Sequence, residues 1–256
     1  MKKVDLNDVC IIIPVTLDSI SRLENLVCIV NFISDNFEVE IQLLETAPYP
    51  NYIIQKLLQG KINYHFFPSS DVIFHRTKFI NNLVSKTNKN IVGVWDSDVL
   101  CHPNQIVESI NLLKEDKVDY VYPYSDRFLD TSKIIRELYF EKLDLNILLM
   151  LQGKMKEIYA PKPVGGAFFI NKQKYISAGL ENEEFYGWGV EDGERATRFS
   201  ILGLKRGRVV GPLFHLTHDR GINSQFHSIQ QDVSKRNILF SIGTMSEMEL
   251  KNFINK

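Results

Sequence analysis

The chain has 256 residues, of which 44% are hydrophobic and 24% are charged. These proportions are ordinary for a globular protein and leave room for one large α/β domain or two small ones. With 30 basic and 31 acidic residues the formal net charge is −1, which argues against a protein that holds nucleic acid by bulk electrostatics.

The N-terminal apolar run and the cysteines bear on the compartment. The run at residues 9–13 is too short for a signal-peptide core or a membrane span. Cys10, Cys28 and Cys101 are odd in number and form no C-x-x-C pair, so we expect reduced thiols rather than disulfides or a cysteine-based zinc site. These features predict a cytoplasmic protein, either soluble or peripheral at the inner face of the membrane.

The first hundred residues alternate between strand and helix patterns. Residues 9–15 are a mostly β-branched run, typical of a strand buried on both faces. The next helix has Asp18 or Ser19 as its N-cap. Strands are then expected at 39–46, 62–67 and 90–99, and helices at 18–36, 52–60 and 74–88. This order predicts a mostly parallel central sheet flanked by helices.

The second half is less regular. Residues 131–158 have a helical pattern with no turn signal until Gly153. We expect their apolar side chains to face the core or a partner subunit rather than a membrane, because the polar face is not strongly basic. A strand at 165–170, helices from 172 and over 191–204, a strand that leads into a loop at 207–218, and a capping box at 246–249 complete the pattern.

We expect one domain over residues 1–256, because no repeat, low-complexity run or linker divides the chain. Its expected parts are a nucleotide-binding half (1–100), a donor-sugar and acceptor half (101–221) with a helical insertion at about 125–160, and a helical tail (222–256).

Three short segments fall at the carboxyl ends of predicted strands. These clusters are Pro14-Val15-Thr16, Glu45-Thr46 and Asp96-Ser97-Asp98. Because ligands of parallel sheets bind beyond the carboxyl ends of strands, the clusters predict one nucleotide-type pocket. Asp96 and Asp98 could share a divalent cation such as Mg²⁺ or Mn²⁺ and sugar hydroxyls. A solvated or helix-capping turn is the alternative for this D-x-D pattern.

Two histidines, His215 and His218, stand in the segment "FHLTH". Residues i and i+3 of a straight strand point to opposite faces, so both could bind one ion only if the chain bends there. A core or surface histidine is the alternative for either residue. As ligands they suit Mn²⁺ better than Mg²⁺, so a mixed site with carboxylates favours manganese.

Charged residues begin two of the predicted helices. Arg76 and Lys78 begin the helix at 74–88, where an anion such as phosphate would be favoured, although an ordinary solvated helix start explains them equally well. Glu191 and Asp192 begin the helix at 191–204, where the helix dipole stabilises negative charge. Either that stabilisation or the need for a general base explains the acidic pair. Trp188 would provide an apolar wall for a sugar, and the glycines on either side of it would let the backbone approach a ligand.

Five segments occur in a characteristic order: "FHRTKFINN" (74–82), "VWDSDV" (94–99), "VGGAFFINKQKY" (164–175), "FYGWGVEDGERATRF" (185–199) and "FHLTHDR" (214–220). This order resembles that of the inverting β-1,4-galactosyltransferases and of bacterial capsule and chondroitin-type glycosyltransferases. The resemblance covers roughly residues 9–225. It implies the α/β GT-A fold, with a mostly parallel sheet flanked by helices and an irregular acceptor-side C-terminal half.

The resemblance also implies an activity. It is the metal-dependent, inverting transfer of galactose or N-acetylgalactosamine from a UDP-sugar to a glycan hydroxyl, in capsule or surface polysaccharide synthesis. Mn²⁺ or another divalent cation is the expected cofactor. The expected partners are a UDP-sugar donor and a glycan acceptor, with no nucleic acid. Peripheral membrane contact and a homo-oligomer are left open.

The resemblance assigns roles to matching residues. Asp98, His215 and His218 would bind the metal, Asp192 would be the catalytic base, and Glu191 would hold substrate hydroxyls. The expected substrate contacts include the strand-end residues Pro14, Val15, Thr16 and Glu45. To these the resemblance adds Phe74, Arg76, Asp96, Gly165, Gly166 and Trp188.

The chain departs from the family pattern at two places. Gly193 stands where the vertebrate enzymes carry a further acidic residue, and Val15-Thr16 stands where they carry aromatic and basic residues. Both departures bear on which acceptor is used and, less strongly, on which donor is used, and Gly193 is where we look for acceptor preference.

Two other classes of protein remain as alternatives. A metal-dependent nucleotidyltransferase usually has a glycine-rich loop after its first strand, and the segment at 11–20 contains no glycine. A non-catalytic sugar-nucleotide-binding protein would have its Asp192 far from any bound donor.

Overall fold

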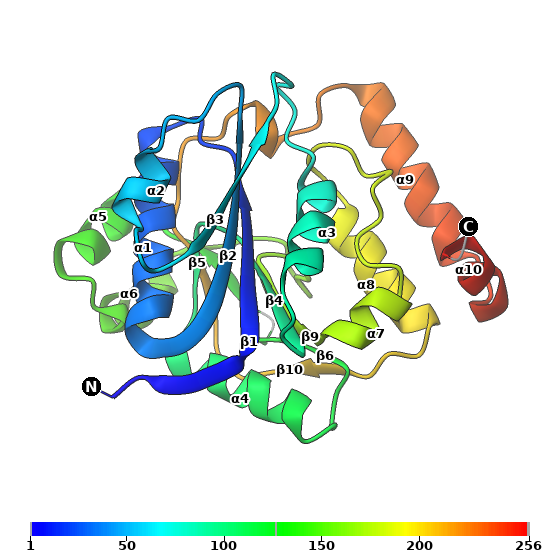
Figure 1. The fold of residues 1–256 in the computed structure, drawn as a ribbon, viewed down its shortest axis with the longest axis horizontal. Coiled ribbons are helices and arrows are strands. Elements are labelled where there is room, and N and C mark those ends of the chain that lie inside the picture. Colours follow the sequence, from blue (N-terminus) through cyan, green and yellow to red (C-terminus); the bar gives the residue numbers. More distant parts are fainter. Residues whose placement is uncertain (1, 126, 255–256) are drawn as a thin grey trace.

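A seven-stranded sheet forms the centre of the computed structural model, which describes residues 2–125 and 127–254 (Figure 1). Its strand order is β10-β6-β9-β4-β1-β2-β3. The strands are β1 (Val4–Val15), β2 (Phe37–Ala47), β3 (Asn63–Pro68), β4 (Ile91–Trp95), β6 (Tyr120–Tyr122), β9 (Ala167–Asn171) and β10 (Arg206–Arg208). Strands β1 to β4 pair in parallel, as the alternating pattern predicts, and β10 is parallel to β6. Only β9 runs antiparallel, to β4 and β6, so the sheet is mostly parallel.

Helices cover both faces of this sheet. In Figure 1, α1 and α2 lie on one side and α3 and α8 on the other. The helices are α1 (Ile20–Asn36), α2 (Ile53–Leu57), α3 (Arg76–Lys86), α4 (Pro103–Lys114), α5 (Lys133–Lys142), α6 (Leu145–Leu151), α7 (Lys172–Ser177), α8 (Glu191–Ile201), α9 (Ile229–Gly243) and α10 (Glu247–Ile254). Ser19 caps α1, because its hydroxyl accepts a hydrogen bond from the Arg22 backbone N–H at 3.3 Å. Residues 9–13 of β1 are fully buried, as predicted for a strand covered on both faces.

A second, four-stranded sheet packs beside the first. Its order is β5-β11-β7-β8, with β5 (Val99–Leu100), β11 (Leu213–His215), β7 (Phe128–Asp130) and β8 (Lys156–Glu157). The sequence pattern predicted one strand over 90–99, and this is wrong. The chain leaves the large sheet after Trp95, and Val99 pairs instead with His215. This turn is important for the site, because it brings Asp98 next to the end of β11.

The single helical stretch expected over 131–158 is also interrupted. Leu143 adopts a left-handed backbone conformation (φ 50°), and Asp144 caps a new helix by accepting a hydrogen bond from the Asn146 N–H at 3.0 Å. The pattern therefore divides into α5, α6 and a 3₁₀ turn at Gln152–Lys154. Buried side chains of α5, such as Tyr139, face the core as expected. Within the described ranges, no helix is both long and apolar enough to cross a membrane.

The last part of the chain is helical. Helix α9 packs against α8. The predicted capping box forms the start of α10: the Ser246 N–H donates to Glu249 Oε2 at 2.8 Å, and the Glu249 N–H donates to Ser246 Oγ at 3.3 Å.

Candidate functional site

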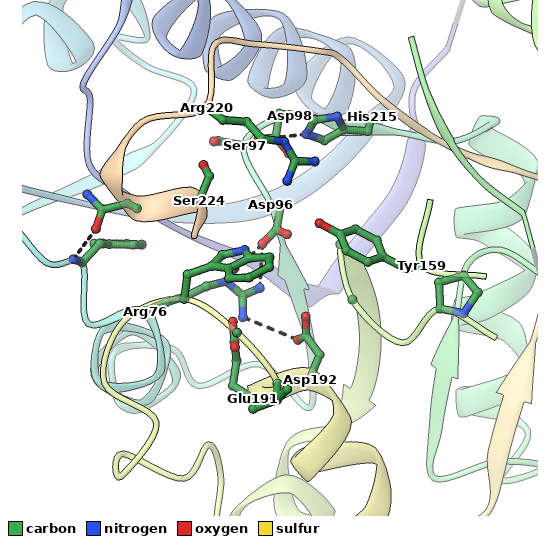
Figure 2. Close-up of a pocket in the computed structure, with 18 of the residues that line it drawn as sticks. Arg76, Asp96, Ser97, Asp98, Tyr159, Glu191, Asp192, His215, Arg220 and Ser224 are labelled. Atoms are coloured by element: carbon green, nitrogen blue, oxygen red, sulfur yellow. Dashed lines mark hydrogen bonds and ion pairs between the residues drawn. The ribbon is translucent and has the colours of Figure 1, made fainter. Parts of the chain in front are cut away.

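A cavity of about 440 Å³ opens at the carboxyl ends of β1 and β4. Nearly all residues that the sequence predicted for the site line it: Pro14, Val15, Thr16, Phe74, Arg76, Asp96, Asp98, Gly165, Gly166, Trp188, Glu191, Asp192, His215 and His218. In Figure 2, Asp98 and His215 lie at one end and Glu191 and Asp192 at the other, with Arg76 and Asp96 between them. Segments far apart in sequence thus meet in one pocket, as the strand-end argument predicted.

Glu45 is the exception. It does not line the cavity, although it stands at the end of β2. Its side chain is buried, and Glu45 Oε2 accepts a hydrogen bond from the Tyr64 hydroxyl of β3 at 2.5 Å. The carboxylate therefore links two neighbouring strands, and the expected substrate contact is corrected.

Asp98, His215 and His218 form the one candidate metal-binding group among the residues that the structure describes. Their ligand atoms lie within 4.8 Å of one another. His218 Nε2 is 3.1 Å from Asp98 Oδ2, and His215 Nε2 is 3.7 Å from the same oxygen. The strand β11 ends at His215, so His218 lies in irregular chain beyond it, and the two rings come within 5.2 Å of each other, centroid to centroid. The alternation that would send residues i and i+3 of a straight strand to opposite faces therefore does not apply.

The other ring nitrogen of each histidine is already engaged. His215 Nδ1 lies 2.7 Å from Asp130 Oδ1, and His218 Nδ1 lies 2.9 Å from the Asp219 carbonyl oxygen. A proton on Nδ1 leaves the Nε2 lone pair directed at Asp98, which is the arrangement of metal-binding imidazoles. One carboxylate and two imidazole nitrogens fit a divalent transition metal.

The carboxylates beside His215 act on its charge. Burial lowers the pKa of His215, but the nearby Asp98 and Asp130 outweigh it and leave that pKa raised. Burial likewise acts to raise the pKa of Asp98, but His215 and His218 hold it below its usual range. The site therefore keeps an ionised carboxylate, and a cation at His215 Nε2 would have to displace a proton from that nitrogen. Asp130 was not predicted, because only the pairing of β7 with β11 brings it opposite His215.

Arg76 connects the two acidic parts of the cavity. Its Nη2 and Nε donate to Asp96 Oδ1 at 2.6 and 3.2 Å, and its Nη1 is 3.7 Å from Asp192 Oδ1. Burial, with Asp98 and Asp192 nearby, raises the pKa of Asp96 even though Arg76 acts to lower it. The guanidinium thus balances part of the negative charge in a cavity with four acidic side chains: Asp96, Asp98, Glu191 and Asp192.

Asp192 occupies a closely fitted position at the start of α8. A Cβ atom built on Gly165 would lie 2.5 Å from Asp192 Oδ2, so only glycine leaves room for this carboxylate. Asp192 Oδ1 is 2.8 Å from Arg195 Nη2, in addition to its contact with Arg76. Glu191 is buried beside it, and the desolvation of Glu191, with the charge of Asp192, raises the pKa of Glu191 to about 7.

Replacing Glu191 by glutamine should stabilise the folded protein at pH 8 but not at pH 5. Because the folded pKa of about 7 exceeds the ordinary 4.5, the folded state binds a proton that the unfolded state releases between those values. The contribution of this group to stability therefore falls as the pH rises through that window. We expect Glu191→Gln to raise the free energy of unfolding at pH 8 by about 2–3 kcal/mol. This gain corresponds to a melting temperature higher by roughly 5 °C. Thermal melts of both proteins at pH 5 and pH 8 test this, and an equal difference at both pH values contradicts it.

The glycines beside Trp188 have a different use from the expected one. A Cβ on Gly189 would lie 2.5 Å from the Phe226 ring, and a Cβ on Gly187 would lie 3.0 Å from the Ile73 side chain. The Cβ positions of both glycines are therefore occupied by side chains of this chain. Gly187 does not line the cavity, so the expected approach to a ligand is corrected there, whereas Gly189 does line it. Trp188 itself lines the cavity and meets the edge of Phe226, with 5.3 Å between the ring centroids.

The segment that follows β11 builds one wall of the cavity. Lys235 of α9 is buried, and its ammonium donates to the carbonyl oxygens of Gly187 and Trp188 at 2.8 Å each. Sequence reasoning found neither this clamp nor several lining residues, which are Arg22, Phe128, Tyr159, Lys162, Arg220, Asn223, Ser224, Phe226 and Arg236. Most of them are isolated residues in helices and loops; Arg220 ends the segment at 214–220, and Phe128 begins β7.

Comparisons with known proteins now place the fold. No protein-family model and no curated protein matches the chain. Among solved structures, the catalytic domain of Drosophila β1,4-galactosyltransferase 7, in complex with xylobiose, superposes with a TM-score of 0.57 and 15% identity, over 90% of this chain and 80% of that one. Glucosyl-3-phosphoglycerate synthase from Mycobacterium tuberculosis, in complex with phosphoglyceric acid, gives a TM-score of 0.54 and 14% identity, over 91% and 77%. Both are GT-A glycosyltransferases, and this chain has the GT-A fold, as the sequence predicted.

Proposed function

We propose that the protein is a metal-dependent, inverting glycosyltransferase that moves a hexose from a UDP-sugar to a glycan hydroxyl. The observation that carries the proposal is that one cavity of a GT-A fold holds both a candidate metal-binding group and a candidate general base. The Asp98–His215–His218 group lies at one end and the Asp192 carboxylate at the other, with Arg76 reaching toward both Asp96 and Asp192. We propose galactose or N-acetylgalactosamine as the sugar and capsule or surface polysaccharide synthesis as the process.

The proposed reaction is a single displacement at the anomeric carbon. Asp98, His215 and His218 would hold the divalent cation, which we propose to be Mn²⁺; when bound it neutralises the charge of the leaving diphosphate. Asp192 accepts the proton of the acceptor hydroxyl while that oxygen forms a bond to the anomeric carbon. The bond between that carbon and the diphosphate oxygen breaks, and UDP leaves with the electron pair. Attack from the face opposite the leaving group inverts the configuration.

Other residues of the cavity have positioning roles in this proposal. Arg76 and Asp96 lie between the metal group and Asp192, where the donor sugar would stand. Trp188 and Phe226 form an apolar wall against a sugar face. Gly193 lines the cavity, and a Cβ there would meet nothing within 4 Å, so this position offers open space for the acceptor.

Calorimetric titration with UDP-sugars tests the proposal directly. We expect UDP-galactose or UDP-N-acetylgalactosamine to bind in the presence of Mn²⁺ and to bind much more weakly after chelation. GDP- and ADP-sugars serve as controls for the base. If no UDP-sugar binds under either condition, the proposed function is overturned. Binding without transfer to any glycan would favour a non-catalytic sugar-nucleotide-binding protein, and turnover of a nucleoside triphosphate with a sugar phosphate would favour a nucleotidyltransferase.

A further inference from the structure

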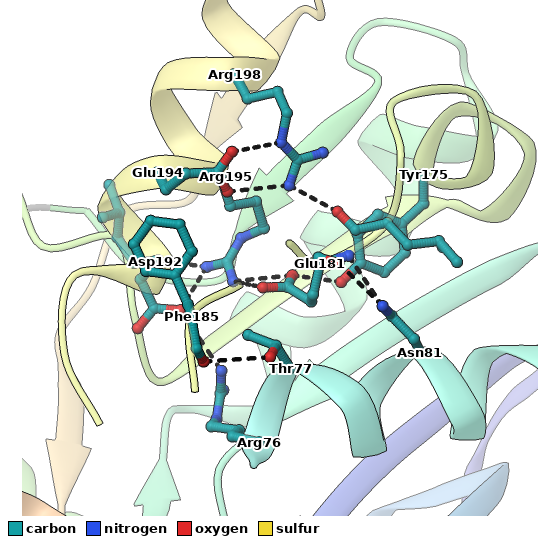
Figure 3. A network of polar contacts seen from close by, with 12 residues as sticks. Arg76, Thr77, Asn81, Tyr175, Glu181, Phe185, Asp192, Glu194, Arg195 and Arg198 are labelled. Carbon is teal, nitrogen blue, oxygen red and sulfur yellow. Dashed lines mark hydrogen bonds and ion pairs between the residues drawn. The ribbon is translucent and has the colours of Figure 1, made fainter. Parts of the chain in front are cut away.

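Arg195 is a fully buried cation directly beneath the cavity. Its side chain is 1% exposed, and it lies one turn after Asp192 on α8. Its Nη2 is 2.8 Å from Asp192 Oδ1 and donates to the Val164 carbonyl oxygen at 2.9 Å (Figure 3). Val164 precedes Gly165, the residue that leaves room for Asp192 Oδ2. One guanidinium therefore contacts both the carboxylate and the loop against which that carboxylate packs.

Glu181 holds this guanidinium from the other side. Arg195 Nη1 donates to Glu181 Oε1 and Oε2 at 3.1 and 3.2 Å. Glu181 is buried too and accepts a hydrogen bond from the Tyr175 hydroxyl, while its backbone N–H donates to Asn81 Oδ1 at 2.9 Å. Arg195 is therefore fixed by contacts to two carboxylates and a carbonyl, and Figure 3 shows it between Asp192 and Glu181.

A neighbouring pair shows what a purely structural arginine looks like in this helix. Arg198 is also buried, and its Nε donates to Glu194 Oε1 at 2.7 Å. Its other contacts are the carbonyl oxygens of Ala178 and Leu180. That pair is one cation with one carboxylate, and neither residue lines the cavity. Arg195 instead faces two carboxylates, of which Asp192 lines the cavity.

Because Asp192 lies between two guanidiniums, its two carboxylate oxygens differ in their surroundings. Oδ1 is buried and lies within ion-pair distance of Arg195 and Arg76, without a hydrogen bond from either. Because 27% of the Asp192 side chain is still exposed, Oδ2 is the oxygen left to accept a proton from a molecule in the cavity. A general base acts well only when its accepting atom is held at a fixed place and angle to the substrate.

We propose that Arg195, held in place by Glu181, is a positioning residue that fixes the Asp192 carboxylate with Oδ2 toward the acceptor hydroxyl. This inference rests on the proposed function. Arg195 does not touch the substrate and acts through Asp192. A lysine at this position could provide the charge, but its single ammonium could not contact Asp192, Val164 and Glu181 at once as the branched guanidinium does.

Arg195→Lys tests the inference, with Arg198→Lys as the matched control on the same helix. We expect Arg195→Lys to lower kcat about 100-fold, the order of loss that a misplaced catalytic group produces, with KM and the Kd for the UDP-sugar unchanged. Arg198→Lys should leave kcat within a few-fold of the unaltered protein. In addition, low concentrations of free guanidinium should restore part of the kcat of Arg195→Ala and none of that of Arg198→Ala.

A double variant, Arg195→Met with Glu181→Gln, removes both charges and leaves no unpaired buried carboxylate at 181, so that folding is preserved; it should show the same loss of kcat. Equal activity of Arg195→Lys and the unaltered protein overturns the inference alone. A loss of kcat matched by a loss of donor affinity also overturns it, because Arg195 would then support the donor site. An unaltered protein that binds no UDP-sugar and transfers no sugar overturns the proposed function, and the inference falls with it.

Discussion

Asp192→Asn should abolish sugar transfer while the donor still binds. Asparagine keeps the shape of the side chain and its fit against Gly165, but it cannot take a proton from the acceptor hydroxyl. Removal of a general base costs about 10²–10⁴-fold in rate, so kcat should fall by at least that factor. Steady-state kinetics with saturating donor and acceptor measure the loss, and calorimetry measures the Kd for the UDP-sugar.

Asp8→Asn is the matched control for this experiment. Asp8 pairs with Lys114 at 3.0 Å, partly exposed, and it stands on β1 before the strand reaches the cavity. The same chemical change there should leave kcat and donor binding unaltered. A loss of less than tenfold in Asp192→Asn, or the disappearance of donor binding, would contradict the role assigned to Asp192.

The first half of the fold could be predicted because its signals are local. The run at 9–13 is apolar throughout since both faces of β1 are covered, and Ser19 marks the start of α1 through one short-range hydrogen bond. Parallel pairing of β1 to β4 then follows from the alternation of strands and helices.

Elements that depend on distant partners could not be predicted in this way. The residues at 99–100 continue the β pattern of β4, and only their pairing with β11 assigns them to another sheet. The break between α5 and α6 rests on a left-handed residue, Leu143, that is not a glycine, so no turn signal marked it.

The residues of the candidate site likewise fall into those that a local sequence pattern reveals and those that depend on distant partners. Residues of the D-x-D pattern, of the segment at 188–192 and of the histidine pair could be found because their chemistry lies within a few positions, and the fold brings them into one cavity. Glu45 has the same local pattern as a strand-end ligand, yet Tyr64 of the adjacent strand uses its carboxylate. Asp130 and Glu181 act on site residues 85 and 14 positions away, which no local pattern shows.

Asp98→Asn should remove high-affinity binding of Mn²⁺ and, with it, sugar transfer. Asp98 Oδ2 faces the Nε2 atoms of His215 and His218 and is the one anionic donor of the group. An asparagine amide brings no charge to balance the cation. Loss of a partner that merely orients a metal ligand already weakens metal binding by about 10–100-fold, so loss of this ligand should exceed that range. Calorimetric titration with Mn²⁺, without donor, measures the affinity independently of activity.

Asp130→Asn should have a smaller effect on Mn²⁺ binding than Asp98→Asn, because Asp130 orients His215 without belonging to the metal group. It should weaken Mn²⁺ binding by about 10–100-fold, and raising the Mn²⁺ concentration should restore transfer, as it should not in Asp98→Asn. The order of Mn²⁺ affinity should therefore be the unaltered protein, then Asp130→Asn, then Asp98→Asn, with Asp8→Asn equal to the first. If Asp98→Asn binds Mn²⁺ as tightly as the unaltered protein, the cation is held elsewhere and the Asp98–His215–His218 group serves only as a network of hydrogen bonds between β11 and β5.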